Sequence, residues 1–172
     1  MPTLAAITHE DFVADVLALA EQLGAERERA PDFLVGIGRG GLVPAVFLSH
    51  ATGLPMLSID HSSQVPEFAA ELIATLAART RGGERFIVVD DINDSGTTIR
   101  SLRDALAVAG AAEGGVRFAV LIDNVSSTER VDYRAREIDR RDDKRWFVFP
   151  WEAVAPTATI VEDAEAVTGR LG

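Results

Sequence analysis

Cysteine is absent from the 172-residue sequence, which excludes disulfide bonds and thiolate chemistry. Long apolar runs are also absent, so we expect no membrane-spanning segment and no integral membrane protein. The first nine residues, from Met1 to His9, lack the basic start and the apolar core of a signal peptide. Together these absences favour a cytoplasmic protein.

Positive charge is scarce. The chain has 17 lysine and arginine residues against 27 aspartate and glutamate residues, which gives a net charge of −10. Because non-specific affinity for nucleic-acid backbones comes from lysine and arginine, we expect no nucleic-acid partner. An acidic chain that binds a phosphate-rich ligand must use local donors instead, such as backbone N–H groups, single arginines or a divalent cation.

Helical and extended apolar patterns alternate along the chain. A first helix is expected after Thr8, a residue suited to an N-cap, and further helices are expected at residues 42–51, 67–79 and 97–108. Short buried strands are expected at residues 33–37, 55–59, 86–89 and 116–122. This alternation predicts an α/β fold, with a mainly parallel, twisted sheet flanked by helices.

No repeat or linker divides the sequence, so a single domain over residues 1–172 is expected. Residues 61–65 are expected to form a turn. The charge-balanced run at residues 139–145 is expected to be a solvated loop. After residue 152 the pattern assigns no structure.

Residues 90–98 carry the strongest chemical signal. They follow the strand at 86–89 and read Asp-Asp-Ile-Asn-Asp-Ser-Gly-Thr-Thr. Gly96 permits a tight turn, and the next helix begins with free N–H groups that suit an anion. The adjacent carboxylates of Asp90 and Asp91 suit sugar hydroxyls and a hard cation such as Mg²⁺. The alternative is a solvated turn capped by Asp94 or Ser95, and no Walker motif is present.

A second glycine-rich segment, Gly38-Arg-Gly-Gly41, lies between the strand at 33–37 and the next helix. Its backbone N–H groups can approach an anion while Arg39 supplies a forked cation. Taken alone, the segment fits a packing turn equally well.

These two segments resemble the phosphoribosyl diphosphate (PRPP) motif and the pyrophosphate loop of the type I phosphoribosyltransferases. The resemblance covers roughly residues 33–152, which it identifies as the core of a single domain with a small hood region. It implies a Mg²⁺-dependent pentosyltransferase that moves ribose 5-phosphate from PRPP to a nucleobase and releases pyrophosphate. It also implies a cis peptide bond between Gly38 and Arg39.

The same resemblance implies roles for individual residues. Asp90 and Asp91 would face the ribose hydroxyls, with Asp91 at the metal, and Asp94 would act in catalysis by exchanging a proton with the purine imidazole nitrogen. The full set implied to bind PRPP and nucleotide is Arg39, Gly40, Gly41, Asp90, Asp91, Asp94, Ser95, Gly96, Thr97 and Thr98.

The aromatic segment Trp146-Phe-Val-Phe-Pro-Trp-Glu152 is similar to the purine pocket of the bacterial xanthine–guanine enzymes. The similarity implies that Trp146 and Phe147 stack on the base, with Glu152 near its exocyclic edge. Core packing is the alternative. The resemblance also implies a 6-oxopurine acceptor (xanthine, guanine or hypoxanthine) in nucleotide salvage, and a homodimer or homotetramer.

One difference from the family pattern leaves the identity of the acceptor base open. Where 6-oxopurine enzymes place a lysine that donates to the purine oxygen, this chain has Asn124, whose amide can both donate and accept. Asn124 therefore joins the expected base-binding residues, while adenine or orotate remains an alternative acceptor. A non-catalytic sensor of PRPP or nucleotide on the same fold is a further alternative.

Overall fold

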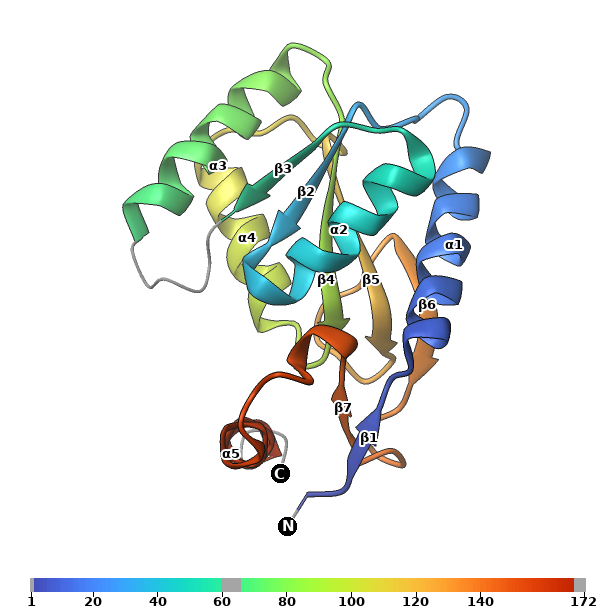
Figure 1. The fold of residues 1–172 in the computed structure, drawn as a ribbon. Helices are drawn as coiled ribbons and strands as arrows, with labels where there is room; N and C mark the ends of the chain where they lie inside the picture. Colours follow the sequence, from blue (N-terminus) through green and yellow to red (C-terminus); the bar gives the residue numbers. More distant parts are fainter. Residues whose placement is uncertain (1, 60–65, 169–172) are drawn as a thin grey trace.

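The computed structural model describes residues 2–59 and 66–168 (Figure 1). Its centre is a five-stranded parallel sheet in the order β3-β2-β4-β5-β6. The strands, in that order, are Met56–Ile59, Phe33–Ile37, Phe86–Asn93, Val116–Asn124 and Tyr133–Ile138. The chain adds β3 on one side of β2 and then returns to place β4 on the other side. The order therefore reverses between β2 and β4, where parallel sheets characteristically bind ligands at the carboxyl ends of their strands.

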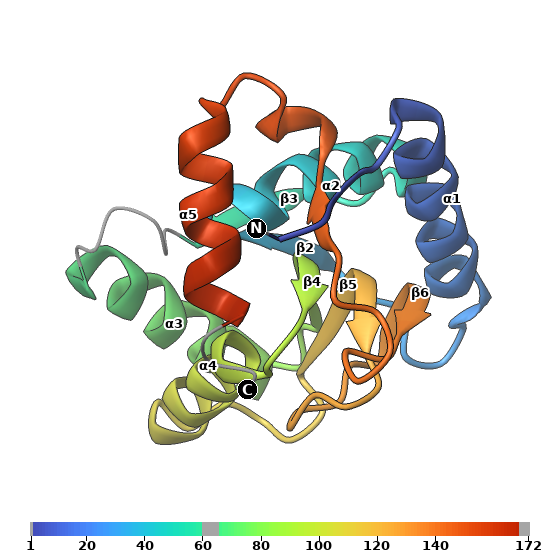
Figure 2. The same cartoon turned by 90° about the horizontal axis from the view of Figure 1, so that it is seen from below.

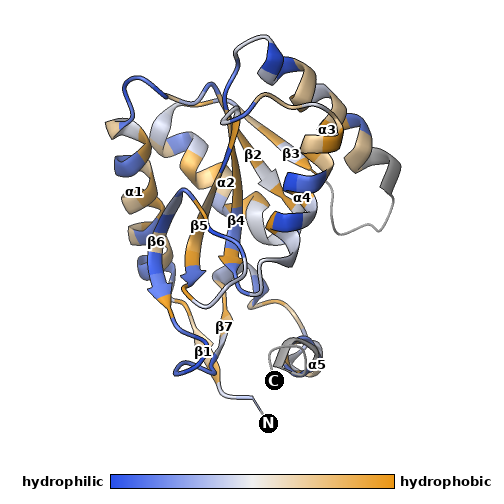
Figure 3. Cartoon of the chain, turned by 180° about the vertical axis from the view of Figure 1, so that it is seen from behind, coloured by the Kyte–Doolittle hydropathy of each residue, from blue (hydrophilic) through white to orange (hydrophobic). Residues whose placement is uncertain are grey.

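Helices cover both faces of the sheet, as the alternating pattern predicted. Helices α1 (His9–Ala25) and α2 (Gly38–Thr52) pack on one face, and α3 (Pro66–Arg81) and α4 (Thr97–Val108) on the other. Successive β4 residues alternate between the two cores, with Ile87 and Val89 facing α1 and α2. Figure 3 shows the inner strands as mostly hydrophobic, while the edge strand β6 is hydrophilic.

The N-cap expected at Thr8 is confirmed: its hydroxyl accepts a hydrogen bond from the Asp11 N–H at 3.0 Å. The expected helix at residues 97–108 coincides with α4. No helix among the described residues is long and apolar enough to cross a membrane. The turn expected at residues 61–65 lies outside the described residues.

The structure corrects two expected boundaries. Strand β4 continues to Asn93 because its parallel pairing with β5 continues to Asp123, so Asp90 and Asp91 belong to a strand and not to a loop. Helix α2 begins at Gly38, so the expected glycine-rich loop forms the first helical turn. The Gly38–Arg39 peptide bond is trans, contrary to the cis bond that the resemblance implied.

A small hood lies beyond the carboxyl ends of the sheet strands (Figures 1 and 2). It consists of the two-stranded parallel sheet of β1 (Leu4–Ala6) and β7 (Trp146–Val148), the 3₁₀ turn η1 (Pro150–Glu152) and helix α5 (Thr157–Thr168). The N-terminal segment and the segment after residue 145 thus meet over the end of the sheet.

Candidate active site

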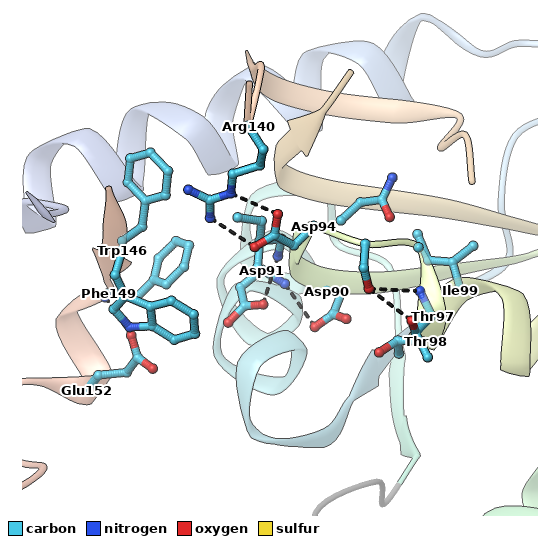
Figure 4. Close-up of a pocket in the computed structure, with 15 residues that line it drawn as sticks. Asp90, Asp91, Asp94, Thr97, Thr98, Ile99, Arg140, Trp146, Phe149 and Glu152 are labelled. Carbon is cyan, nitrogen blue, oxygen red and sulfur yellow. Dashed lines mark hydrogen bonds and ion pairs between the residues drawn. The ribbon is translucent and has the colours of Figure 1, made fainter. Parts of the chain in front are cut away.

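Two adjoining cavities lie where β4 ends beneath the hood. The first has a volume of about 540 Å³ and is lined by residues 90–99, Arg140, Trp146, Phe147, Phe149 and Glu152. The second, about 660 Å³, is lined by residues 37–40, the end of β4, and residues of η1 and α5. The residues common to both are Asp90, Asp91, Thr98, Trp146 and Glu152. Most of the residues predicted from the sequence therefore surround one composite site, and Figure 4 shows those that line the first cavity.

The first cavity ends at the N-terminus of α4. Gly96 is the N-cap with a φ of 90° and supplies no side-chain cap, and the Thr97 N–H donates to Ser95 Oγ at 3.3 Å, so the positive helix end opens into the cavity. The hydroxyls of Ser95 and Thr97 lie 2.9 Å apart beside it. Thr128 steadies the turn by donating to the Ser95 carbonyl at 2.8 Å. This is the geometry of an anion cradle, and it favours that reading over a solvated turn.

The second cavity ends at the N-terminus of α2, which also lacks a side-chain cap. Gly40 lies against Asp91: a Cβ atom on Gly40 would be 2.4 Å from Asp91 Oδ2. Arg39 is exposed and lines the cavity. The glycines thus let the helix end approach the acidic strand end closely, and Arg39 adds a cation there.

Asp90 and Asp91 form an acidic pair between these two helix ends. The Asp91 N–H donates to Asp90 Oδ1 at 3.0 Å, and the Ile92 N–H donates to Asp91 Oδ1 at 2.7 Å. Burial, together with the charge of Asp91, raises the pKa of Asp90 well above its ordinary value. Burial, together with the charge of Glu152, raises the pKa of Asp91 to about 6. Two partly buried carboxylates that form no ion pair with a basic residue in the described part of the chain are an unfavourable arrangement, which a cation would relieve.

The donor set fits Mg²⁺ better than a cation held by protein ligands alone. The described part of the chain contains no cluster of three or more histidine, aspartate or glutamate side chains placed to hold a metal. Mg²⁺ usually takes one or two carboxylates and completes its shell with water and substrate oxygens. Asp90 and Asp91 supply that number of ligands at the centre of the composite site.

Asp94 is held by a residue that the sequence did not indicate. Arg140 Nε and Nη2 donate to the two carboxylate oxygens of Asp94 at 2.8 and 3.0 Å (Figure 4). The Arg140 side chain is only 9% exposed and that of Asp94 15%. The expectation of a solvated loop at residues 139–145 is wrong at Arg140, whereas Arg141 does form an exposed pair with Asp139.

Asn124 does not line either cavity. It is buried, and its amide Nδ2 donates to the Asp94 carbonyl at 2.9 Å. Its Oδ1 accepts the N–H groups of Ser126 and Arg140, each at 3.1 Å. Asn124 thus connects the main chains of the two residues that form the ion pair.

Aromatic side chains form the wall opposite β4. Trp146, Phe147 and Phe149 line the first cavity, and Phe149 was not among the expected site residues although it lies in the aromatic segment. Phe149 stacks on Trp151 at 4.8 Å between ring centroids, and Trp151 also contacts Phe12. The segment therefore serves both core packing and the cavity wall.

Glu152 caps η1, with its Oε2 accepting the Phe149 N–H at 2.8 Å. Burial raises the pKa of Glu152, and the positive charge of Arg39 opposes that rise. Glu152 consequently adds a third partly buried carboxylate beside Asp91.

Known proteins resemble this chain in sequence and in fold. The family model of the phosphoribosyl transferase domain matches residues 5–155. A xanthine-guanine phosphoribosyltransferase of Idiomarina loihiensis is 30% identical over 137 residues, covering 76% of this chain and 75% of that protein.

Two solved structures have a similar fold. A purine phosphoribosyltransferase from Pyrococcus horikoshii superposes with a TM-score of 0.62 at 27% identity, covering 88% of this chain and 96% of that one. A xanthine-guanine-hypoxanthine phosphoribosyltransferase of Helicobacter pylori has a TM-score of 0.63 at 23% identity, over 86% of this chain and 92% of that one. At 23% identity, the similarity to the Helicobacter pylori structure shows a shared fold alone.

Proposed function

The chain belongs to the phosphoribosyl transferase domain family, and from this premise we propose that it transfers ribose 5-phosphate from PRPP to a 6-oxopurine base. Pyrophosphate is the other product, and the reaction serves purine salvage. One observation carries the proposal: the acidic pair of Asp90 and Asp91 lies between two uncapped helix N-termini and faces an aromatic wall. These parts match the two anionic ends, the sugar and the base of the reactants.

The two helix ends divide the anionic groups of PRPP between them. The 5′-phosphate binds at the start of α4, where the N–H groups of the first turn and the hydroxyls of Ser95, Thr97 and Thr98 are available. The diphosphate binds at the start of α2, where Gly40 permits close approach, Gly41 packs the helix end onto β4, and Arg39 offers a forked cation. This division explains how a chain with a net charge of −10 binds a polyanion.

Asp90 and Asp91 bind the ribose hydroxyls, and Asp91 would also hold Mg²⁺. When bound, Mg²⁺ supplies positive charge that neutralises the diphosphate. The carboxylates also place negative charge next to the anomeric carbon, which stabilises an oxocarbenium-like transition state there. Chelation of Mg²⁺ with EDTA is therefore expected to abolish turnover.

Trp146 and Phe147 stack on the base, and Glu152 accepts from its exocyclic edge. Asp94 accepts the proton of the imidazole nitrogen as N9 attacks the ribose. Its two oxygens each accept one hydrogen bond from Arg140, which leaves further lone pairs for this proton. Arg140 keeps the carboxylate fixed in the cavity wall.

Pyrophosphate release in the presence of Mg²⁺ and PRPP tests the proposal, with xanthine, guanine, hypoxanthine, adenine and orotate as separate acceptors. Turnover with a 6-oxopurine supports it. Turnover with adenine or orotate alone would refute the acceptor assignment, and PRPP binding without turnover of any base would favour a sensor. If Asp94→Asn turned over as fast as the wild type, the role of Asp94 would be wrong.

Assembly and location form the last part of the proposal. The resemblance implies a homodimer or homotetramer, and the lack of cysteine is consistent with a cytoplasmic protein. Sedimentation velocity of the purified chain measures the first directly.

A further inference from the structure

The buried pair of Arg140 and Asp94 presents a hydrogen-bond donor and an acceptor side by side on the wall of the first cavity. We propose that Arg140 is the residue that recognises the oxygen on C6 of the purine, and that Asn124 positions it. This inference rests on the proposed function, since it concerns the base that the same site accepts. It assigns the choice between oxo and amino purines to a residue in a run whose other two arginines, Arg141 and Arg145, pair with Asp139 and Asp143.

A count of the Arg140 donors shows that one remains for a ligand. A guanidinium carries five N–H groups. The Nε–H and one Nη2–H bind Asp94, and Nη1 donates to the carbonyls of Asp143 and Arg145 at 3.3 and 2.5 Å. The second Nη2–H has no partner among the residues that the structure describes. Arg140 lines the cavity beside Asp94, so this N–H is the donor available to a bound base.

The purine edge has the complementary pattern. In a 6-oxopurine the imidazole N7 and the oxygen on C6 are neighbours on one edge, whereas an adenine carries an amino group at C6. A base protonated at N7 therefore offers a donor to Asp94 and an oxygen acceptor to Arg140. With adenine, the amino group would meet the guanidinium, and two donors would face each other.

Burial makes this mismatch costly. Both side chains of the pair are at most 15% exposed, and the adjacent wall is formed by aromatic rings. The guanidinium also lies over the ring of Phe147, 5.3 Å from its centroid, which restricts its movement. An unpaired donor in such a place loses its water without a replacement, and sites of this kind reject the analogue that lacks the hydrogen-bonding group strongly.

Asn124 can both donate and accept hydrogen bonds, and positioning the Arg140–Asp94 pair requires both. Its Nδ2 donates to the carbonyl of Asp94, and its Oδ1 accepts the N–H of Arg140. A lysine has donors only and could not hold the Arg140 main chain in this way. The asparagine at position 124 and the arginine at position 140 thus act together: the first places the pair, and the second contacts the base.

The test compares hypoxanthine with unsubstituted purine, which differ only in the oxygen on C6 and the proton that accompanies it. For the wild type we expect kcat/KM to favour hypoxanthine by at least about 100-fold. Arg140→Met, which removes the donors and keeps an unbranched apolar stem, should reduce that preference to about tenfold or less. Arg141→Met is the matched control, because Arg141 is exposed and pairs with Asp139 outside both cavities. It should retain the wild-type preference.

Two further variants keep the test decisive if Arg140→Met folds poorly. Arg140→Lys retains the charge beside Asp94 but not the fork, and the preference should again fall at least tenfold. Asn124→Ala should raise the KM for hypoxanthine while the KM for PRPP stays within about twofold, a split that general destabilisation would not produce. A wild-type preference in both Arg140 variants overturns the inference and leaves the proposed function intact. No turnover of any base by the wild type overturns both.

Discussion

Gly41 lies so close to Val89 that a Cβ atom on Gly41 would be 2.0 Å from the Val89 carbonyl oxygen. The first turn of α2 therefore packs directly on the backbone of β4. This contact places the N-terminus of α2 beside the acidic end of the strand, which the proposed diphosphate site requires. Neither backbone can move away without disturbing the sheet.

We expect Gly41→Ala to lower the free energy of unfolding by about 3 kcal/mol, since the methyl group would meet main-chain atoms that cannot rotate away. For a chain of this size that is a fall in Tm of roughly 6 to 12 °C. Thermal unfolding followed by circular dichroism measures it. Gly24→Ala is the control: beyond its own helix backbone, no atom of the described residues lies within 4 Å of its added Cβ, and alanine in a helix should leave Tm unchanged or slightly raised. Equal Tm values for the two variants would contradict the packing argument.

Gly40→Ala should affect activity far more than stability. Its Cβ atom would lie 2.4 Å from a carboxylate oxygen of Asp91, and that side chain can rotate away. The loss in Tm should be below about 3 °C, which corresponds to about 1 kcal/mol. Displacing Asp91 by about 1 Å should lower kcat/KM for PRPP by roughly 100-fold. Unchanged kinetics with PRPP would show that the position of Asp91 is unimportant for the reaction.

The fold was predictable where one segment carries its own pattern. Strand β4 and helix α4 have clear apolar periodicities, and their expected positions were confirmed or extended. Strand β6 was missed because Arg134 and Arg136 interrupt any apolar run on this edge strand. Strands β1 and β7 have three residues each, too few to show a period, and they form only by pairing with one another across the chain.

The site residues were likewise predictable only where they lie together in one segment of the sequence. The residues from Asp90 to Thr98 are contiguous, so their composition and order indicated a sugar-phosphate site, and the structure gathers them around one cavity. Arg140 could not be found in this way, because its partner Asp94 is 46 positions away. A charge-balanced run has the same composition whether its arginines face water or are buried, and only the folded chain distinguishes Arg140 from Arg141.

The raised pKa of Asp91 predicts that removing its carboxylate stabilises the Mg²⁺-free protein and abolishes activity. Its ordinary value is 3.8 and its folded value about 6, so the folded chain without Mg²⁺ holds a proton at Asp91 more tightly than the unfolded chain does. Between pH 3.8 and about pH 6, the free energy of unfolding falls as pH rises. At pH 7.5 the destabilisation by the charged Asp91 carboxylate is at its largest. Asp91→Asn removes that charge and should stabilise the Mg²⁺-free protein by about 1 to 3 kcal/mol at pH 7.5, while abolishing turnover.

Differential scanning fluorimetry in EDTA at two pH values checks this prediction. At pH 4.5 the wild-type Asp91 is mostly protonated in the folded state, so the advantage of Asp91→Asn should shrink by more than half. A variant that is less stable than the wild type at pH 7.5 would contradict it. So would a gain that is the same at both pH values, because that would come from something other than titration.

Gly83 and Gly96 have nearly the same φ, so a comparison of the two distinguishes backbone strain from a functional effect at the N-terminus of α4. Gly96 has a φ of 90° and Gly83 a φ of 95°, so alanine at either position costs about 1 to 2 kcal/mol of strain. Gly83 has open space around it. At Gly96 the added Cβ would lie 2.6 Å from the Thr128 hydroxyl and 2.8 Å from the Glu129 nitrogen, so the turn that begins α4 must shift. We therefore expect both variants to lose Tm, with the larger loss for Gly96→Ala.

Steady-state kinetics then distinguish the two glycines. Gly83→Ala should keep the wild-type KM for PRPP, since Gly83 lines neither cavity and precedes the N-terminal end of β4, whereas the cavities lie at its C-terminal end. Gly96→Ala should raise that KM at least tenfold, because a phosphate bound by the first N–H groups of α4 depends on where the helix begins. Assays run at least 10 °C below the lower Tm exclude partial unfolding as the cause. An unchanged KM in Gly96→Ala would mean that the 5′-phosphate does not bind at this helix end, and the assignment of the two anion sites would have to be abandoned.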